Sequence, residues 1–570
     1  MNFDDPPPAD EDYLAPAIGL AILLLSLTYL LWRAISFLRP RNQHSLRSVA
    51  ILVLGDVGRS PRMMYHAQSF AECEFVTDVI GYKGSRVIPS LERLPKVQLH
   101  YLAEPPTWLS RLPFVIAAPF KIFHQVLTIL VVLIVDIEAA PEFLLVQNPP
   151  SIPTLAIVWI VSRIRGSKVI IDWHNLGYSI LALKLGENHI YVRISTWFER
   201  YFGRSAYAHL FVTQAMRDHL VSKWDLQGHK IVLHDRPHSQ FHRTTPQEIH
   251  DLFIKLQAVL LAQPSLRGFL PRGTLPYSTA FTATDGDDPV KKDVGIPISV
   301  TQPTLKEIAP PRLRADRPAL LVSSTSWTED EDFGMLIEAL EKYEAAARER
   351  NAKRDGFGAA ADERDAERGR SSTPLPKVLC VVTGKGPLRI KYMQRIGKLQ
   401  TGWTWVRCVS MWLEAEDYPL LLGAADLGVS LHTSSSALDL PMKVVDMFGA
   451  GTPVCALDFA CINELVKDGK NGLIFKTSEE LAQQLMDLFS DFPNGTQQLD
   501  AMRAILQGKN EKIHASRPLE HAHAMDRTPE RMQRQPSVEE DEWEWSSWDE
   551  NWAKTVRPLL LWDALGPRQK

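Results

Sequence analysis

The sequence predicts an α/β protein made of two doubly wound domains behind an N-terminal transmembrane helix. Three observations support this prediction. A long uncharged segment lies near the N-terminus, and two separate stretches of the remaining chain alternate short apolar runs with helical patterns. Such alternation is typical of parallel sheets whose strands are connected by helices. At 570 residues the chain is long enough for each domain to have its own core.

The N-terminal segment Leu14–Trp32 contains no charged residue. At about 1.5 Å rise per residue, a helix of this length nearly spans a hydrocarbon core of about 30 Å. Acidic residues precede the segment and arginines follow it, which predicts a lumenal N-terminus (1–13), an anchor (14–32) and a cytosolic body. A cleaved signal peptide would begin with basic residues, so we expect the anchor to be retained.

The first alternation predicts one domain over residues 48–242. Thr213 is the expected N-cap of its helix Gln214–Trp224. The expected strands are Val49–Leu54, Phe75–Gly81, Val97–Leu102, Phe143–Val146, Lys168–Ile171 and His209–Val212, with a helix at Pro61–Ala71.

The second alternation predicts a domain over residues 317–492. The expected strands are Ala319–Ser323, Lys377–Thr383, Trp403–Arg407, Leu427–Leu431 and Pro453–Ala456, and the expected helices are Phe333–Ala347, Pro441–Gly449 and Ser478–Phe489. Two Rossmann-like domains of this kind imply a cleft between the carboxyl ends of their strands, where ligands of such sheets bind.

The remaining segments differ in composition from the two domains. Residues 264–316 are rich in Pro and Asp, residues 348–374 are charged, and residues 508–540 are polar and expected to lack structure. Aromatic and apolar residues return at Trp543–Trp562, which predicts a packed helix. The chain thus contains a connecting segment (243–316), a partly disordered segment (493–540) and a C-terminal helix (541–570).

A second apolar stretch covers residues 112–135, where the pattern requires a helix between two strands. A second full membrane span would place the next strand on the wrong side of the bilayer. Two interpretations remain open: a buried crossover helix, or a helix that docks on a membrane surface to meet a lipid substrate.

Overall composition excludes several classes of function. A hydrophobic content of 45% and a charged content of 23% are those of an ordinary globular protein. The net charge of −4 gives no reason to expect nucleic acid as a partner. The five cysteines show no paired spacing, so neither a disulfide framework nor a zinc site is expected, and a reducing compartment fits best.

Two motifs of the first domain follow predicted strands. Gly55–Arg62 combines glycines with Arg59 and Arg62 at a helix start, a pattern that favours anion binding or else forms a simple turn. Ile171–Tyr178 places His174 beside Asp172 at the ligand-facing end of a strand. A histidine that titrates near neutrality suits a general base, and Asp172 is placed to orient it. A structural role remains the alternative for His174.

The segment Val322–Asp332 of the second domain has two features. Its hydroxyl-rich part, Ser323, Ser324, Thr325 and Ser326, is suited to hydrogen-bond a phosphate. Asp330–Asp332 has the Asp-x-Asp spacing of a metal site, but Thr328 to Glu331 also matches a capping box. We favour the capping box and expect no metal here.

Gly384, Lys385 and Gly386 close the next strand of the second domain. Arg389 stands where a dinucleotide fingerprint would have its third glycine, which makes an NAD site a weak interpretation. A tight turn lining a nucleotide pocket is more consistent with these residues.

The strongest motif is Ser434–Val454. Pro441 is expected to begin a helix with Lys443 in its first turn, where backbone amides and the ammonium group can meet a diphosphate together. Asp446 lies three residues after Lys443, hence on the same face, and is suited to accept hydrogen bonds from ribose hydroxyls. An ordinary capped helix with a surface ion pair is the alternative.

Taken together, these segments resemble the chitobiosyldiphosphodolichol β-mannosyltransferases of N-glycan assembly. The resemblance covers most of 48–492 in register and extends to the end of the chain. The matching segments begin at Gly55 (GDVGRSPRM), Gln147 (QNPP), Ile171 (IDWHNLGY), Ser323 (SSTSWTEDEDF), Asp439 (DLPMKVVDMFG) and Trp548 (WDENW).

The resemblance implies a GT-B fold and an activity. Members of the family transfer mannose from GDP-mannose to dolichol-diphosphate-linked chitobiose with a β-1,4 linkage, on the cytosolic face of the endoplasmic reticulum membrane. An α-linked donor that gives a β-product implies inversion, which requires a base and charge stabilisation for departing GDP. GDP-mannose is a substrate, and no cofactor or metal is expected.

Roles for individual residues follow from this implied mechanism. His174 is the candidate base, with Asp172 and Asp56 as alternatives. Lys443 and Ser323–Ser326 are assigned to the donor diphosphate, Asp446 to ribose, and Gly384–Gly386 with the loop after Trp405 to the guanosine. Gly58, Arg59 and Arg62 are assigned to the acceptor diphosphate or the donor.

Two other functions compete with this prediction. A nucleotide-sugar epimerase of the same architecture would need no membrane anchor and no lipid-facing helix. A non-catalytic anchored subunit that recruits a partner transferase would usually keep only one of the two domains. Other mannosyltransferases of the same pathway remain possible partners.

Overall fold

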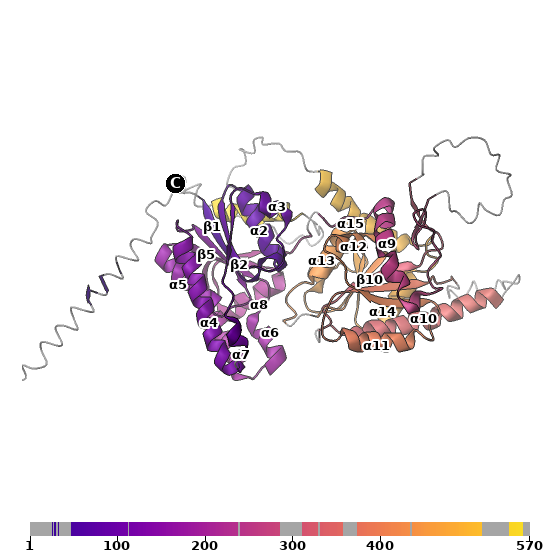
Figure 1. The fold of residues 1–570 in the computed structure, drawn as a ribbon, viewed down its shortest axis with the longest axis horizontal. Coiled ribbons are helices and arrows are strands. Elements are labelled where there is room, and N and C mark those ends of the chain that lie inside the picture. Colours follow the sequence, from indigo (N-terminus) through magenta and orange to yellow (C-terminus); the bar gives the residue numbers. More distant parts are fainter. Residues whose placement is uncertain are drawn as a thin grey trace, which may run out of the picture. The chain divides into compact units, whose positions relative to one another are not determined.

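The computed structural model divides the chain into two compact units, Met1–Leu233 and His234–Lys570 (Figure 1). It describes residues 47–111, 113–237, 240–284, 310–328, 331–356, 373–433, 436–515 and 547–561, together with Leu25, Ser26, Thr28, Tyr29 and Trp32. These five residues are helical, and the rest of the predicted anchor at 14–32 lies outside the described residues.

The first unit contains a seven-stranded parallel sheet in the order β3-β2-β1-β4-β5-β6-β7. The strands are β1 (Ser48–Asp56), β2 (Val76–Tyr82), β3 (Val97–Tyr101), β4 (Phe143–Asn148), β5 (Lys168–Trp173), β6 (Ser205–Phe211) and β7 (Gln227–Val232). The helices between them are α2 (Pro61–Glu72), α3 (Pro89–Arg93), α4 (Phe114–Val131), α5 (Thr154–Arg165), α6 (Gly177–Leu185), α7 (Ile190–Gly203) and α8 (Gln214–Trp224).

Local sequence explains why these elements form where they do. The β1 residues Val49–Val53 are an unbroken apolar run and all are buried, as expected for a central strand covered on both faces. Thr213 caps α8 as predicted, since its Oγ1 accepts a hydrogen bond from the Met216 amide at 3.0 Å. The sequence ends the first domain after residue 242, whereas the chain divides between Leu233 and His234.

The second unit contains a six-stranded parallel sheet in the order β12-β11-β10-β13-β14-β15, which confirms the second doubly wound domain. The strands are β10 (Ala319–Ser324), β11 (Val378–Thr383), β12 (Val406–Met411), β13 (Leu427–Ser430), β14 (Val454–Leu457) and β15 (Gly472–Phe475). The main helices are α9 (Pro246–Leu261), α10 (Phe333–Gly356), α11 (Arg389–Leu399), α12 (Asp417–Ala424), α13 (Met442–Gly449) and α14 (Ser478–Leu488).

Two local predictions for the second unit are wrong. The strand expected at Trp403–Arg407 begins only at Val406, and the buried Glu344 carboxylate accepts hydrogen bonds from the amides of Thr404 and Trp405 just before it. The predicted capping box at Thr328–Glu331 does not form. Helix α10 begins at Phe333, and the Asp332 carboxylate accepts a hydrogen bond from the Gly334 amide at 3.0 Å.

Segments outside the two sheets contain more structure than the composition indicates. Within the connecting segment, β8 (Thr282–Ala283) pairs with β9 (Arg312–Leu313). Helix α15 (Gln497–Ala515) continues through residues 508–515, which were expected to lack structure. The predicted C-terminal helix consists of α16 (Trp548–Thr555) and α17 (Arg557–Leu561).

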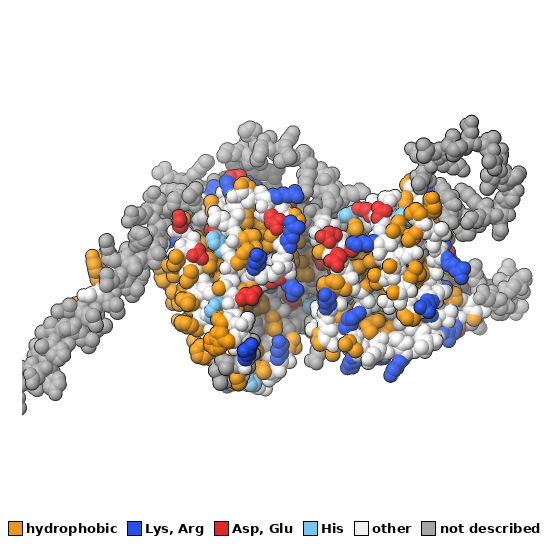
Figure 2. Space-filling view, in the orientation of Figure 1, with side chains coloured by type: hydrophobic (Ala, Val, Ile, Leu, Met, Phe, Trp, Pro, Cys, Tyr) orange, Lys and Arg blue, Asp and Glu red, His pale blue; other side chains and the backbone are white. Residues whose placement is uncertain are grey.

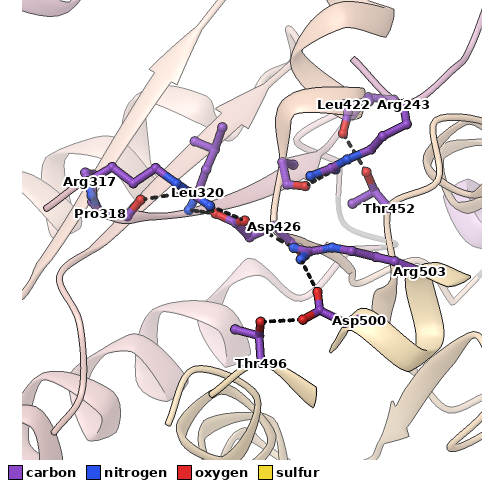
Figure 3. Close-up of polar contacts among 11 residues, drawn as sticks. Arg243, Arg317, Pro318, Leu320, Leu422, Asp426, Thr452, Thr496, Asp500 and Arg503 are labelled. Atoms are coloured by element: carbon purple, nitrogen blue, oxygen red, sulfur yellow. Dashed lines mark hydrogen bonds and ion pairs between the residues drawn. The ribbon is translucent and has the colours of Figure 1, made fainter. Parts of the chain in front are cut away.

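A buried charge cluster lies before the amino ends of β10 and β13 in the second unit (Figure 3). Asp426 receives two hydrogen bonds from the Arg317 guanidinium, at 2.6 and 3.0 Å, and one from Arg503 of α15 at 3.1 Å. Burial would raise the pKa of Asp426, but the two arginines and the Leu320 amide lower it to about 2. Arg243 donates to the Ala425 carbonyl at 2.7 Å, which ties the segment after residue 240 to the sheet.

Helix α4 is the crossover helix predicted between β3 and β4, but much of it is not buried. Phe120, Phe123 and Leu127 are exposed on its outer side. Among the residues that the structure describes, Pro119–Asp136 is the one helical stretch long and apolar enough to cross a membrane by length and composition, with a mean hydropathy of 1.7. The interpretation of α4 as a fully buried helix is therefore wrong.

Candidate active site

The candidate base lies at the carboxyl end of β5. Asp172 is a fully buried strand residue, and His174 follows the strand with 21% of its side chain exposed. The Nε2 of His174 lies 2.8 Å from Oδ2 of Asp172, and the His174 amide donates to the Asn148 carbonyl at 2.9 Å. The structure thus brings together the two residues expected to form a base and its orienting carboxylate, with one edge of the imidazole accessible.

Helix α2 supplies two further partners of Asp172. The Arg62 guanidinium donates to both carboxylate oxygens, at 2.8 and 2.9 Å, and to the Leu233 carbonyl at 2.8 Å. His66, one turn later and fully buried, has its Nε2 3.3 Å from Oδ2. Arg62 is 4% exposed, so the structure places it within the unit and not at a ligand surface as the sequence suggested.

The ionisation of this cluster follows from its contacts. Burial tends to raise the pKa of Asp172, but the charge of Arg62 and the contacts with His174 and His66 hold it well below its usual range. Burial lowers the pKa of His66, which outweighs the effect of Asp172 and keeps this histidine neutral. These contacts therefore favour the ionised form of Asp172.

The glycine-rich turn after β1 is occupied by contacts within the turn and its neighbouring loop. The Asp56 carboxylate accepts hydrogen bonds from the Gly58 amide at 3.0 Å and from the Ser85 amide and hydroxyl, both at 2.8 Å. Burial raises the pKa of Asp56, but these hydrogen bonds and Arg59 lower it overall. A Cβ on Gly58 would lie 2.4 Å from the Ser85 carbonyl oxygen, so only glycine fits. Arg59 is 81% exposed.

Sequence reasoning missed Glu199, a buried residue of α7. Its carboxylate accepts hydrogen bonds from the amides of Gly177 and Tyr178, at 2.9 and 3.2 Å, and from the Asn148 side chain at 3.1 Å. It therefore caps helix α6 directly after the His174 loop, and burial raises its pKa despite these hydrogen bonds. No local signal identifies this role, because the contacts join residues far apart in sequence.

Two loops meet at the carboxyl edge of the second sheet. Ser323 and Ser324 belong to β10 and are buried, and Thr325 is buried after it, so Ser326 is the exposed residue of the predicted hydroxyl-rich loop. Gly384 has a φ of 125°, and a Cβ there would lie 1.8 Å from the Thr325 carbonyl oxygen. A Cβ on Gly386 would lie 1.8 Å from the Ser326 carbonyl oxygen. These glycines thus let the two loops pack directly together.

Lys443 lies in the first turn of α13, as predicted. Its ammonium group forms an ion pair with the buried Glu331 carboxylate and lies 3.4 Å from the Ser326 hydroxyl. Glu331 also accepts hydrogen bonds from the Thr325 hydroxyl and, at 2.8 Å, from the Ser326 amide. The structure therefore brings Lys443 to the hydroxyl-rich loop through an acidic residue that was expected to cap a helix.

Asp446 lies one turn along α13 from Lys443. Burial raises the pKa of Asp446 to about 7, and the nearby charge of Asp235 adds to the effect. Burial and the charge of Asp446 raise the pKa of Tyr418, and the hydrogen bond with Ser324, whose hydroxyl is 3.1 Å from the Tyr418 hydroxyl, partly offsets this rise. A carboxylate at the edge of such a polar cluster is suited to a ligand with several hydroxyl groups.

The acidic run before α10 gives no sign of a metal centre in the part of the chain that the structure describes. No group of three His, Cys, Asp or Glu side chains there is arranged to hold a metal ion. Glu329 and Asp330 lie outside the described residues, so this observation leaves the expected absence of a metal as a prediction.

Both units match known protein families. Residues 58–235 match the "Glycosyl transferase 4-like domain", and residues 364–491 match "Glycosyl transferases group 1". Two doubly wound parallel sheets, each with polar loops at its carboxyl edge and each matched to such a family, define a glycosyltransferase of GT-B type.

Relatives identify the family within this class. The chain is 39% identical over 549 residues to a chitobiosyldiphosphodolichol beta-mannosyltransferase of Mus musculus, which covers 96% of this chain and 95% of the relative. It is 40% identical over 523 residues to the Homo sapiens protein of the same name, covering 92% and 94%. The chain belongs to the chitobiosyldiphosphodolichol beta-mannosyltransferase family. An Arabidopsis thaliana relative, named "UDP-glycosyltransferase TURAN", is 40% identical and covers 80% of this chain and 91% of its own length.

Proposed function

We propose that this protein transfers mannose from GDP-mannose to the chitobiose of a dolichol-diphosphate-linked acceptor, with inversion to a β-1,4 linkage. One observation carries the proposal: hydrogen-bond donors of Thr325, Ser326 and Lys443 converge at the carboxyl edge of the second sheet. Donors and a cation at the start of a helix are what a departing diphosphate requires. The family name supports the same acceptor and sugar.

In this mechanism His174 is the base of the acceptor unit. Asp172 accepts the Nε2–H of the imidazole, which leaves Nδ1 to take the proton of the acceptor hydroxyl. The hydroxyl oxygen then bonds to C1 of mannose, and the bond from C1 to the diphosphate breaks with its electron pair going to GDP. Asp172 and Asp56 are proposed to act as positioning groups, because the contacts of both carboxylates favour the ionised form.

Lys443 is proposed to stabilise the charge that develops on GDP, and Asp446 to accept hydrogen bonds from ribose. Gly384–Gly386 and the loop that follows β12 are proposed to border the guanosine. Arg59, with its exposed guanidinium, is the remaining candidate of the first unit for the acceptor diphosphate. Since Lys443 and helix α13 supply positive charge, we expect no requirement for a metal.

The outer side of the first unit supports a membrane-bound acceptor. Figure 2 shows hydrophobic side chains gathered over α4, α5 and α7. Exposed apolar patches of this extent mark interaction surfaces, and aromatic side chains beside arginines suit the membrane interface. Helix α7 also exposes Arg193 and Arg200. The exposed apolar residues of α4 and α7, called the apolar face below, are Phe120, Ile122, Phe123, Leu127, Val131, Ile190, Tyr191, Ile194, Trp197 and Tyr201.

We propose that the protein is a single-pass protein of the endoplasmic reticulum membrane with its catalytic body in the cytosol. The arginines after residue 32 support this orientation. Asn494-Gly495-Thr496 supplies a test, because Asn494 is exposed on the second unit. We expect this sequon to remain unmodified in cells, as judged by mobility after endoglycosidase treatment. A glycan on Asn494 would invert the proposed topology.

A UDP-sugar is the specific alternative to GDP-mannose as the donor. The Arabidopsis thaliana relative carries a name that specifies UDP, although its identity to this chain is similar to that of the mannosyltransferases. Direct competition between GDP-mannose and UDP-sugars distinguishes the two donors. The epimerase and the recruiting subunit receive no support from these relatives.

The test is transfer by the purified full-length protein. Labelled GDP-mannose and a synthetic chitobiosyl-diphosphate lipid are incubated with and without a chelator, beside Lys443→Ala. The matched control is Lys476→Ala, which removes a lysine that also pairs with a carboxylate of the same unit, Asp458 at 3.6 Å. We expect transfer by the wild type and the control, loss in Lys443→Ala, and no effect of the chelator. Transfer only from a UDP-sugar would overturn the proposed donor.

A further inference from the structure

Glu331 occupies the position at which the expected phosphate donors of the second unit are aimed. Its carboxylate accepts hydrogen bonds from the Thr325 hydroxyl, the Ser326 amide and the Lys443 ammonium group. The residue is 4% exposed, and its backbone forms an isolated antiparallel bridge with His432. One buried carboxylate thus receives three donors that would equally suit an anionic ligand.

A carboxylate in this place acts on a bound diphosphate in two ways. It neutralises the charge of Lys443, and its own charge repels phosphate oxygens that approach the same donors. Loop support alone does not require the charge, because a neutral glutamine side chain also presents an acceptor to the Ser326 amide. The charge of Glu331 therefore opposes the binding of the ligand that the surrounding donors attract.

We propose that Glu331 is an internal anion that holds the phosphate donors in the nucleotide-free protein and weakens the binding of nucleoside diphosphates. The effect is larger for the product than for the donor substrate. The terminal phosphate of GDP has a second ionisation with a pKa of about 6, whereas that oxygen is esterified in a sugar nucleotide. Glu331 is thus a positioning residue that favours release of GDP. This inference rests on the proposed use of Lys443 for the donor diphosphate.

The direction in which Glu331→Gln changes nucleotide affinity separates this role from a purely structural one. If Glu331 only ordered the loop, Glu331→Gln would leave nucleotide binding unchanged or weaken it. If it competes with the diphosphate, the same change tightens binding, because Lys443 loses its internal partner. Near the protein surface, removal of one unit charge a few Å from a bound diphosphate is expected to change its affinity by about tenfold. We expect GDP to bind about tenfold more tightly to Glu331→Gln, and GDP-mannose about threefold.

The experiment is calorimetric titration of GDP and of GDP-mannose into full-length wild type, Glu331→Gln and Glu479→Gln at pH 7.5. Glu479 is the matched control, since it pairs with Lys342 on α10 and is far from the phosphate donors in sequence. Its substitution is expected to leave both affinities unchanged. Where Glu331→Gln fails to fold, Glu331→Asp withdraws the carboxylate from Lys443 by one methylene and is expected to tighten GDP in the same direction.

The outcomes separate the inference from the function on which it rests. Tighter binding of GDP, with a larger gain for GDP than for GDP-mannose, supports the role of Glu331. If the wild type binds GDP but a folded Glu331→Gln variant binds it equally or more weakly, the inference on Glu331 is overturned and the proposed donor site still stands. Failure of the wild type to bind either nucleotide would instead overturn the proposed donor site at Lys443.

Discussion

Helices α7 and α14 belong to domains of the same winding but expose opposite kinds of side chain. In α7 the buried residues include Val192 and Ser195, whereas Trp197 and Tyr201 are exposed, at 59% and 55%. In α14 the buried residues are again small or apolar, but the exposed ones are Glu479, Glu480, Gln483 and Asp487. Both helices bury the side that faces the core of their own unit. We infer from the difference between the outer faces that the two helices meet different surroundings.

The carboxyl ends of the two sheets differ in a related way. In the first unit Arg62, His66 and Asp172 are buried and contact one another, whereas the His174 imidazole and the Arg59 guanidinium are accessible. In the second unit the donors around Lys443 satisfy a single carboxylate at an accessible edge. We infer that the first unit is built to present one proton acceptor to a membrane-held acceptor, and the second to exchange an anion with solution. Four predictions test this contrast, from the largest expected effect to the smallest.

Replacing His174 with alanine is expected to lower kcat by about 10²- to 10⁴-fold, the usual contribution of a general base. Binding of GDP should not change, because His174 belongs to the other unit. Transfer assays and nucleotide titrations on one preparation measure both quantities. His100→Ala is the control, since His100 pairs with Asp78 at 2.8 Å in the same unit. A loss of GDP affinity equal to the loss of kcat would remove the division of roles between the units.

Replacing Asp426 with asparagine is expected to destabilise the second unit by about 3–5 kcal/mol, because it leaves buried arginines without their partner. Asp500→Asn is the matched control; its carboxylate is 60% exposed, so a loss of about 0–1 kcal/mol is expected. Denaturant unfolding of both variants measures the difference. Equal effects would show that the buried cluster contributes no more than a surface ion pair.

The ion pairs of Asp426 also predict that the stability of the second unit falls at acid pH. The pKa of Asp426 is lowered to about 2 in the folded protein, against about 3.9 in an unfolded chain. Its contribution to the free energy of unfolding is therefore fully present above about pH 4 and is lost as the pH falls towards 2. The difference in stability between wild type and Asp426→Asn should narrow over this range.

Local sequence patterns were sufficient for the sheets and for parts of the site. Apolar runs predicted β1 and β10, a threonine before a helical pattern predicted α8, and placement after β5 predicted that Asp172 and His174 lie together. These features depend on neighbours in sequence. Each is fixed by strand burial or by capping, for which residue type and spacing are direct signals.

The partners of these residues were not predictable in the same way. Arg62 and Asp172 are 110 positions apart, and Glu331 and Lys443 are 112 apart. A carboxylate carries no local mark of which distant donors will reach it, so Glu331 was assigned to a capping box and Arg62 to a ligand. The outer side of α4 posed a related problem, because an apolar residue facing lipid and one facing the core look alike in sequence.

The apolar face gives the third prediction. Trp197→Ser and Phe123→Ser each remove an exposed large side chain, and Phe123 is 67% exposed. If lipid covers these residues, each change should weaken vesicle binding by roughly tenfold, from the apolar area lost. The free energy of unfolding in detergent-free buffer should change by no more than about 0.5 kcal/mol. Flotation with liposomes of protein that lacks residues 1–46, which include the predicted anchor, measures binding, with Gln483→Ser of α14 as control. Equal flotation of all variants would contradict the contrast between α7 and α14.

The last prediction concerns Asp446. Its carboxylate is proposed to bind ribose, but its ionisation lowers the free energy of unfolding. Its pKa is raised to about 7 by burial and by Asp235, against about 3.9 when unfolded. The folded state therefore binds the extra proton between these values, and the free energy of unfolding falls as the pH rises from about 4 to about 7. Asp446→Asn does not titrate, so its Tm should exceed that of the wild type at pH 8 and match it near pH 4.

Loss of GDP binding by Asp446→Asn, together with the gain in stability at pH 8, would mean that the second unit retains an unfavourable, half-buried carboxylate for its ligand. The measurement is thermal unfolding from pH 4 to pH 8 beside nucleotide titration. Asp458→Asn is the control, since this carboxylate pairs with the exposed Lys476 at 3.6 Å and should change neither quantity. A variant that binds GDP as tightly as the wild type would remove Asp446 from the ribose site, and a Tm difference independent of pH would show that its charge is not what destabilises the unit.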